Sequence, residues 1–226
     1  MLRIDDFENP FSAFYALGAH LPAPSVPTPE PKATSVVDAC DFCVIDTETS
    51  GLAARDVAVQ VAIVFFDANG RQIGVYDRIW TLPDGVRIGR RAFAVHRINT
   101  AKIRAEGFAA REELPRVHRM LKRVLARGKL VVAHNAAFDC RMLKQTAAAH
   151  GFCGWNVSRS DIFCTMQSAK DRCGLTTAAG KAKSPTNAEL YRFLVGEAPT
   201  GNLHDAKVDC GVTGKSFAAG VKRGWW

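Results

Sequence analysis

Two acidic residues stand two positions apart in the segment Asp46-Thr47-Glu48. The preceding residues, FCVIDT at 42–47, predict a buried strand. Side chains at i and i+2 of a strand point to the same face, so both carboxylates would lie together at its end. They would repel each other and lose hydration unless a cation joined them. Oxygen-only ligand sets of this kind suit Mg²⁺ or Mn²⁺. A polar strand end entering a turn is the alternative explanation.

Two further segments carry acids beside a predicted helix start. In VVAHNAAFD, residues 131–139, a strand runs into a helix and Asp139 falls in its first turns, where an acid is also favoured by the helix dipole. In HDAKVD, Asp205 can cap the final helix, which places Asp209 one turn in and leaves His204 on the preceding loop. A histidine at that place can equally be a surface or capping residue.

Hydrophobic patterning predicts the elements that position these residues. Strands are expected at 42–47, 57–66 and 72–81, the last two joined by an Asp-Ala-Asn-Gly turn, so the three form an antiparallel meander. After them, helices are expected at 112–126, 136–150, 186–195 and 205–219, and strands at 129–133 and near 159–163. This order predicts an α/β fold, a mixed sheet covered by helices.

Composition narrows the class of protein. A chain of 226 residues with 47% hydrophobic and 23% charged residues suits one soluble domain with an additional segment. The formal charge of +8 favours an anionic partner, nucleic acid first. No apolar run is long enough to span a membrane, and the acidic N-terminus does not resemble a secretory signal. Because the seven cysteines form no disulfide framework, we expect reduced thiols and a cytoplasmic location.

Taken together, the three acidic motifs resemble the DEDDh family of 3′→5′ exonucleases, the DnaQ-like group that includes the proofreading subunits of DNA polymerases. The motifs are Asp-x-Glu at 46–48, His-Asn-x-x-Phe-Asp at 134–139 and His-x-x-x-x-Asp at 204–209. The tyrosine-type relatives carry Tyr four residues before the last Asp. Here that position is Asp205 and His204 lies five before, which marks the histidine branch. The resemblance implies an RNase H-like fold, a five-stranded mixed sheet with the first strand at its centre and helices flanking it.

The resemblance implies a metal-dependent hydrolase. Asp46, Glu48, Asp139 and Asp209 would hold two divalent ions, Mg²⁺ or Mn²⁺, and His204 would be the general base for the attacking water. The expected reaction releases nucleoside 5′-monophosphates from a single-stranded or frayed 3′ end, with DNA favoured and a role in proofreading or repair. Two alternatives remain: an RNA-trimming enzyme of the same family, and a non-catalytic module that binds nucleic acid or docks on a polymerase. The presence of all five catalytic-type residues argues against the second.

A pocket for the terminal nucleotide is also implied by the resemblance, formed by Thr49, Leu52, Val95, His96 and Phe138. Apolar and aromatic side chains stack on a base without reading it, which gives tolerance to sequence. Phe138 could instead belong to the core, as aromatic residues at helical positions commonly do.

The chain is expected to divide into four parts. Residues 1–21 are an N-terminal segment that can form a short helix, 22–40 a proline-rich linker, 41–220 the exonuclease domain, and 221–226 a basic and aromatic tail. The front segment, residues 1–33, could bind a polymerase or another protein, or fold back on the domain. The tail could contact nucleic acid, or its tryptophans could pack on the domain.

Two groups of basic residues and one close pair of cysteines could form further sites. The arginines near the predicted pocket are placed to contact phosphates. The basic residues along the predicted 112–126 helix and just after it suit a solvated face. These are Arg87, Arg90, Arg91 and Arg97 in the first group and Arg116, Arg119, Lys122, Arg123 and Arg127 in the second. The pair Cys40-x-x-Cys43 has no matching second pair, so no structural zinc is expected.

Overall fold

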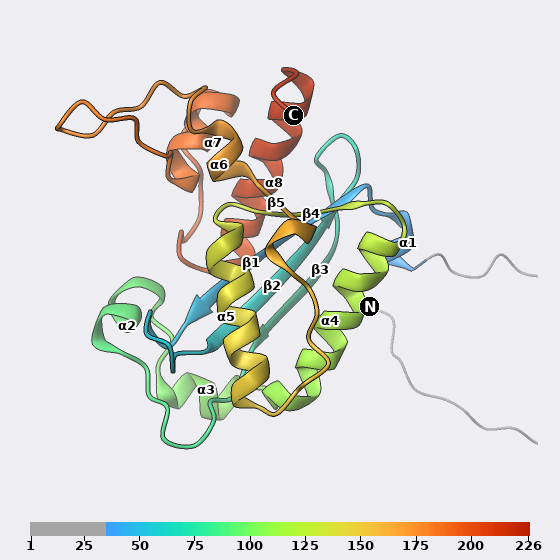
Figure 1. Ribbon diagram of the computed structural model, residues 1–226, viewed down its shortest axis with the longest axis vertical. Helices are drawn as coiled ribbons and strands as arrows, with labels where there is room; N and C mark the ends of the chain where they lie inside the picture. The colour runs from blue at the N-terminus through green and yellow to red at the C-terminus, as the bar shows by residue number, and fades with distance from the viewer. Residues whose placement is uncertain (1–34) are drawn as a thin grey trace, which may run out of the picture. The chain divides into compact units, whose positions relative to one another are not determined.

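A five-stranded sheet in the order β3-β2-β1-β4-β5 forms the centre of the structure, a computed structural model that describes residues 35–226 (Figure 1). β1 pairs antiparallel with β2 and parallel with β4, which confirms the expected mixed sheet with its first strand in the middle. β3 extends the sheet antiparallel on one side and β5 extends it parallel on the other. The strands are β1 (Phe42–Thr49), β2 (Ala58–Phe66), β3 (Gln72–Ile79), β4 (Leu130–Ala133) and β5 (Ile162–Cys164).

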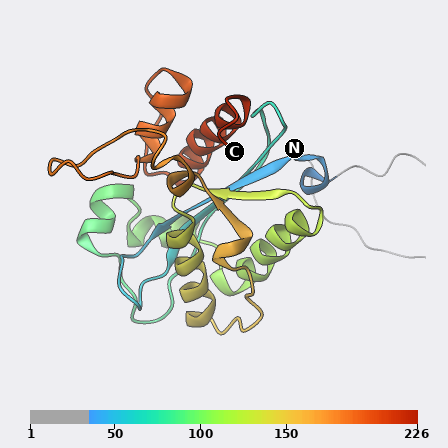
Figure 2. The same ribbon diagram turned by 45° about the horizontal axis from the view of Figure 1, so that its top comes forward.

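Helices cover both faces of this sheet (Figure 2). Helices α4 (Ala110–Ala126) and α5 (Ala136–Ala149) pack their apolar side chains on one face, and α8 (Ala206–Lys222) packs on the other. α7 (Asn187–Val195) lies against α8. The remaining helices are short: α1 (Val36–Ala39), α2 (Arg90–His96), α3 (Thr100–Glu106), η1 (Arg159–Asp161) and α6 (Thr165–Ala169). No helix among residues 35–226 is long and apolar enough to cross a membrane.

Because helices cover both faces of the sheet, β2 is buried on both sides and not on one. The alternation in its sequence predicts one buried side, formed by residues such as Val59, Val61 and Ile63. Every residue of β2 is buried, because Ala62, Val64 and Phe66 pack toward α8 while Val61 and Ile63 pack toward α4 and α5. A strand between two neighbours and under two helix layers has no solvent side.

The expected linker over 22–40 is too long at its C-terminal end. Residues Val36–Ala39 form α1, and Val37 is buried in the main core. Ser35 caps this helix by accepting a hydrogen bond from the Asp38 amide. A helix of four residues is too short to leave a periodic signal in the sequence, so its position is decided by contacts with α4. The expected N-terminal helix and the proline-rich residues up to 34 lie outside the described residues.

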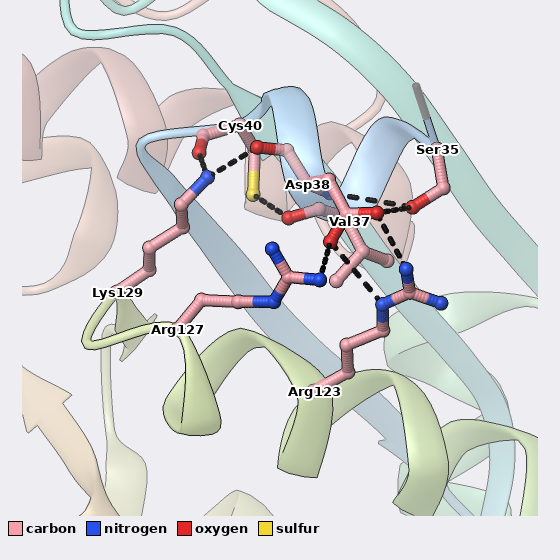
Figure 3. A network of polar contacts seen from close by, with 7 residues as sticks. All are labelled: Ser35, Val37, Asp38, Cys40, Arg123, Arg127 and Lys129. Carbon is pink, nitrogen blue, oxygen red and sulfur yellow. Dashed lines mark hydrogen bonds and ion pairs between the residues drawn. The ribbon is translucent and has the colours of Figure 1, made fainter. Parts of the chain in front are cut away.

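Ion pairs attach α1 to the end of α4 (Figure 3). The Asp38 carboxylate pairs with Arg123 and Arg127, and its oxygen lies 3.0 Å from the Arg127 guanidinium. The Lys129 ammonium donates to the main-chain carbonyl oxygens of Asp38 and Cys40. Part of the basic face predicted on this helix is therefore engaged with the first helix instead of being fully solvated.

The C-terminal tail packs on the domain, which decides between the two expectations for it. Helix α8 continues to Lys222, beyond the expected boundary at 220. The Trp226 indole donates to the Phe217 carbonyl at 3.0 Å, and its ring lies 5.5 Å from that of Phe163. Gly220 permits this contact, because a β-carbon there would lie 2.1 Å from the Trp226 ring.

Candidate active site

Three of the four predicted acids converge where β1 meets α8. Asp46 and Glu48 extend from β1, and Asp209 extends from the first turn of α8. A carboxylate oxygen of each lies within 4.8 Å of the others. The start of α8 is fixed as the sequence predicts, since the Asp205 carboxylate accepts the amides of Lys207 and Val208 at 3.1 and 3.2 Å.

Burial and mutual repulsion make this cluster costly without a cation. Burial, followed by the charges of Asp139, Asp209 and Glu48, raises the pKa of Asp46 well above its ordinary value. Burial and the neighbouring carboxylates raise the pKa of Glu48 to about 8. Within residues 35–226, no Lys or Arg forms an ion pair with Asp46, Glu48 or Asp209. A donor set of clustered carboxylates without a protein counter-charge fits a hard divalent cation.

Asp139, the fourth predicted acid, lies beside this cluster. It is only 2% exposed, in the first turn of α5. Its carboxylate accepts a hydrogen bond from the Thr47 hydroxyl at 2.9 Å. Burial raises the pKa of Asp139 to about 7, although the Thr47 hydrogen bond acts in the opposite direction. Among the neighbouring carboxylates, the charge of Asp139 contributes most to raising the pKa of Asp46, so the two acids share one electrostatic site.

His204 lies on the loop before α8, as expected, and its side chain is exposed. Its backbone is in the left-handed region with φ +69°, an uncommon conformation for a residue with a β-carbon. In this conformation its amide donates to the Asp209 carboxylate at 2.8 Å. The hydrogen bond and the charge of His204 both act to lower the pKa of Asp209, whereas burial raises it overall. The candidate base and a candidate metal ligand are thus held together by one loop.

Asn187, which the sequence did not single out, holds Asp209 from the other side. Its side-chain amide donates to the Asp209 main-chain carbonyl at 3.2 Å and to the carboxylate at 3.4 Å. The Thr213 hydroxyl in turn donates to the Asn187 side-chain oxygen at 3.1 Å. The capping box of Thr186 and Glu189 could have located the start of α7. No pattern in the neighbouring sequence indicates that Asn187, the residue after Thr186, contacts Asp209 of α8.

His134, the histidine of the second motif, holds neighbouring segments together. His134 donates from Nε2 to the Pro185 carbonyl at 3.0 Å, and its Nδ1 lies 3.1 Å from the Thr165 hydroxyl. Burial lowers the pKa of His134 to about 4. A neutral imidazole with both nitrogens engaged joins the end of β4 to α6 and to the segment before α7.

A pocket of about 450 Å³ opens beside the carboxylates, and Glu48 belongs to its wall. All five residues predicted to bind the terminal nucleotide line it: Thr49, Leu52, Val95, His96 and Phe138. Leu52 is 73% exposed and Val95 is 48% exposed, so the pocket presents apolar side chains to the solvent. Phe138 is half-buried and lines the pocket, and it is not part of the hydrophobic core clusters of the described residues. Arg91, one of the four arginines expected near this segment, also lines the pocket.

His96 is buried and forms part of the wall. Its Nε2 donates to the Thr49 carbonyl at 3.1 Å, and its Nδ1 accepts the Ile98 amide at 3.0 Å. Both hydrogen bonds require a neutral ring that carries its proton on Nε2. Burial lowers the pKa of His96, which also favours the neutral ring. The residue therefore ties α2 to the end of β1 and shapes the pocket.

The loop over residues 50–56, which carries Leu52, is held from two sides. The Asp56 carboxylate accepts the Ser50 hydroxyl at 2.9 Å and the Ala53 amide at 2.7 Å. From α5, the Gln145 amide donates to three carbonyl oxygens of this loop at 2.9–3.1 Å. The Gln145 contacts join residues about 90 apart in the chain, so no sequence pattern indicates them.

Comparisons with known proteins agree with this geometry. The exonuclease family model named for RNase T matches residues 43–217. A Rhodobacter capsulatus protein described as "DNA polymerase III subunit epsilon-like protein" is 36% identical over 117 residues, which is 50% of this chain and 15% of that protein. E. coli exonuclease I in complex with a dA16 oligonucleotide matches with a TM-score of 0.64 and 16% identity, over 80% of this chain and 41% of that one. Exonuclease X in complex with 5′-overhanging duplex DNA matches with a TM-score of 0.56 and 25% identity, over 82% of this chain and 94% of that one. With its carboxylate cluster, its pocket and a family match over most of its length, the chain belongs to the RNase T exonuclease family, the DnaQ-like phosphodiester hydrolases.

Proposed function

We propose that this protein removes nucleoside 5′-monophosphates from the 3′ end of DNA in a reaction that requires divalent metal ions. The observation that carries the proposal is the contact between the carboxylate cluster and the pocket, since Glu48 belongs to both. A 3′-terminal nucleotide seated in the pocket would bring the phosphodiester on its 5′ side to the carboxylates. Cleavage there releases one mononucleotide.

Asp46, Glu48, Asp139 and Asp209 are the residues that would hold the metal ions, two Mg²⁺ or Mn²⁺ ions in the proposal. Bound divalent ions supply positive charge for the phosphate oxygens and Lewis acidity for the attacking water and the leaving 3′ oxygen. The buried, unpaired carboxylates support this assignment, because their repulsion is relieved only by protonation or by cations.

His204 is the proposed general base. Its exposed imidazole stands on the loop whose amide holds Asp209, so it can accept a proton from water beside the phosphate. In the pocket, Leu52 and Phe138 would cover the terminal base, and the neutral His96 would hold the wall in place. Apolar contacts of this kind do not distinguish bases, so we propose an activity that tolerates sequence.

DNA is the proposed substrate, and proofreading or repair the proposed role. Support comes from the relatives whose descriptions name a DNA polymerase subunit or bound DNA. This chain spans only 15% of the Rhodobacter relative and 41% of exonuclease I, so their wider activities are not carried over. A protein partner for residues 1–33 concerns residues outside the described range and stays a prediction, as does the cytoplasmic location.

The test offers 5′-labelled single-stranded DNA, duplex DNA and RNA to the full chain with Mg²⁺ or Mn²⁺. We expect a ladder of products shortened from the 3′ end of DNA and none with EDTA. Asp46→Asn should abolish the ladder, whereas Asp171→Asn, an exposed acid outside the site, should not. Shortening of RNA alone would reassign the substrate. A parent chain that binds these polymers without shortening any would show a non-catalytic binding module.

A further inference from the structure

A second, shallow groove of about 450 Å³ follows the outer face of α5, the yellow helix in front of the sheet in Figure 1. Its residues on this helix include Ala137, Arg141, Lys144 and Ala148, whose spacing of three and four places them in one row. At 1.5 Å per residue, the row is about 16 Å long. Arg159 lines the groove from the segment after α5.

The charged residues that line this groove are all positive. Arg141, Lys144 and Arg159 line it, and no acidic residue does. In the described part of the chain, none of these three cations forms an ion pair. Among residues 35–226, the Lys144 ammonium makes no hydrogen bond, and the Arg159 guanidinium donates to the Ile162 carbonyl at 2.7 Å. The other lining residues are Ala137, Ala148, the half-buried Cys140 and the uncharged Gln145. An anionic polymer with apolar faces complements such a surface.

The groove adjoins the nucleotide pocket through Arg141. The Arg141 guanidinium lies 5.5 Å from the centre of the Phe138 ring and donates to the Leu52 carbonyl at 3.3 Å, and both of these residues line the pocket. Ala137, the first residue of the row, is exposed in the first turn of α5, which carries the buried Asp139 on its inner side. A strand whose 3′-terminal nucleotide occupies the pocket therefore has the cations of this row close by.

We propose that the α5 groove binds the sugar–phosphate backbone of the strand being degraded, beyond the nucleotide in the pocket, with Lys144 and Arg159 each contacting a phosphate. This inference rests on the proposed function. A row of about 16 Å corresponds to four or five nucleotides of a stacked strand at roughly 3.4 Å each. Because phosphate contacts carry no sequence information, the groove raises affinity for a polymer without selecting its bases.

The experiment separates binding in the groove from chemistry at the site. Two substrates are compared: single-stranded DNA of twelve nucleotides, and the p-nitrophenyl ester of thymidine 5′-monophosphate, which is long enough to fill only the pocket and the carboxylate site. In Lys144→Glu, we expect KM for the DNA to rise about 5- to 10-fold and kcat/KM for the ester to stay within about twofold of the parent. Arg159→Gln should act in the same direction and more weakly.

Salt dependence supplies an independent measurement. Each lost phosphate contact should reduce the slope of log kcat/KM for DNA against log salt concentration by about 1. Arg119→Glu, a charge reversal at an exposed arginine of α4, is the matched control and should change neither substrate beyond the general effect of net charge. Parent-like KM and salt slope for DNA in both groove variants would overturn the proposal while ester hydrolysis still supported the site. A parent chain that hydrolyses neither substrate would refute the proposed function itself.

Discussion

Replacing Glu48 with glutamine removes a buried negative charge and keeps the shape of the side chain, so the metal-free protein should become more stable at alkaline pH. Glu48 is 9% exposed and lies within the acidic cluster. Burial, followed by the charges of Asp209, Asp205 and Asp139, raises its pKa from 4.5 to about 8. The folded chain therefore holds the Glu48 proton more tightly than the unfolded chain does.

The sign and size of the effect follow from this shift. Because the pKa of Glu48 is higher in the folded chain, proton binding by Glu48 contributes to the free energy of unfolding. This contribution is fully present below about pH 4.5 and is lost as the pH rises through about 8. At about 1.4 kcal/mol per pKa unit, the full shift is worth up to about 5 kcal/mol of unfolding free energy. Water entry and relaxation of the loop before α8 lower the repulsion, so a value of about 2–5 kcal/mol is expected.

The assay is urea unfolding in EDTA, followed by circular dichroism from pH 4.5 to 9. The stability difference between Glu48→Gln and the parent should be near zero at pH 4.5 and reach its full size above pH 8. Glu106→Gln, at an exposed position at the end of α3, should show no such growth. Saturating Mg²⁺ should stabilise the parent most at alkaline pH and the variant less. A difference that does not grow with pH would refute the electrostatic account of the cluster.

Three further predictions concern the base, a positioning residue and the packing of α8. His204→Ala should lower kcat roughly 10²- to 10⁴-fold with little change in KM; an unchanged kcat would remove His204 from the proposed role. Asn187→Ala should raise the Mn²⁺ concentration needed for half-maximal activity about 10-fold, because Asp209 loses a hydrogen bond; an unaltered titration would contradict this. Gly214→Ala places a β-carbon 2.3 Å from the Phe66 ring and should cost about 1–3 kcal/mol in thermal unfolding. Gly211→Ala, on the same helix with open space around it, should instead gain about 0.5–1 kcal/mol, and equal effects at both glycines would be inconsistent with the packing.

Most of the fold is readable from local patterns. The five strands and the four long helices were predicted near their observed positions because each carries its own hydrophobic period and boundary residues. The short helices α2, α3 and α6 were not predicted. Seven residues or fewer give too little periodicity, and contacts with the sheet and the pocket decide their conformation. For the same reason the linker was extended too far, across α1.

The site was readable only in part. The three acidic motifs can be found in the sequence because each has a fixed local spacing, and Asp205 marks the start of α8. The sequence does not show that the four acids have different surroundings. Thr47 bonds Asp139 beside the cluster while Asp46 and Glu48 face Asp209, since neighbouring residues of a strand point to opposite faces.

The sequence by itself determined which residue types are present and which elements carry them: four acids, a histidine, and a five-stranded mixed sheet with helices. Tertiary structure decided what those residues do to one another. The raised pKa of Glu48 and the hydrogen bond from Asn187 to Asp209 both depend on distances between segments that are not neighbours in the chain. Burial and electrostatic interaction depend on those distances and not on order along the chain, which is why local patterns locate the carboxylates but leave their energetics undetermined.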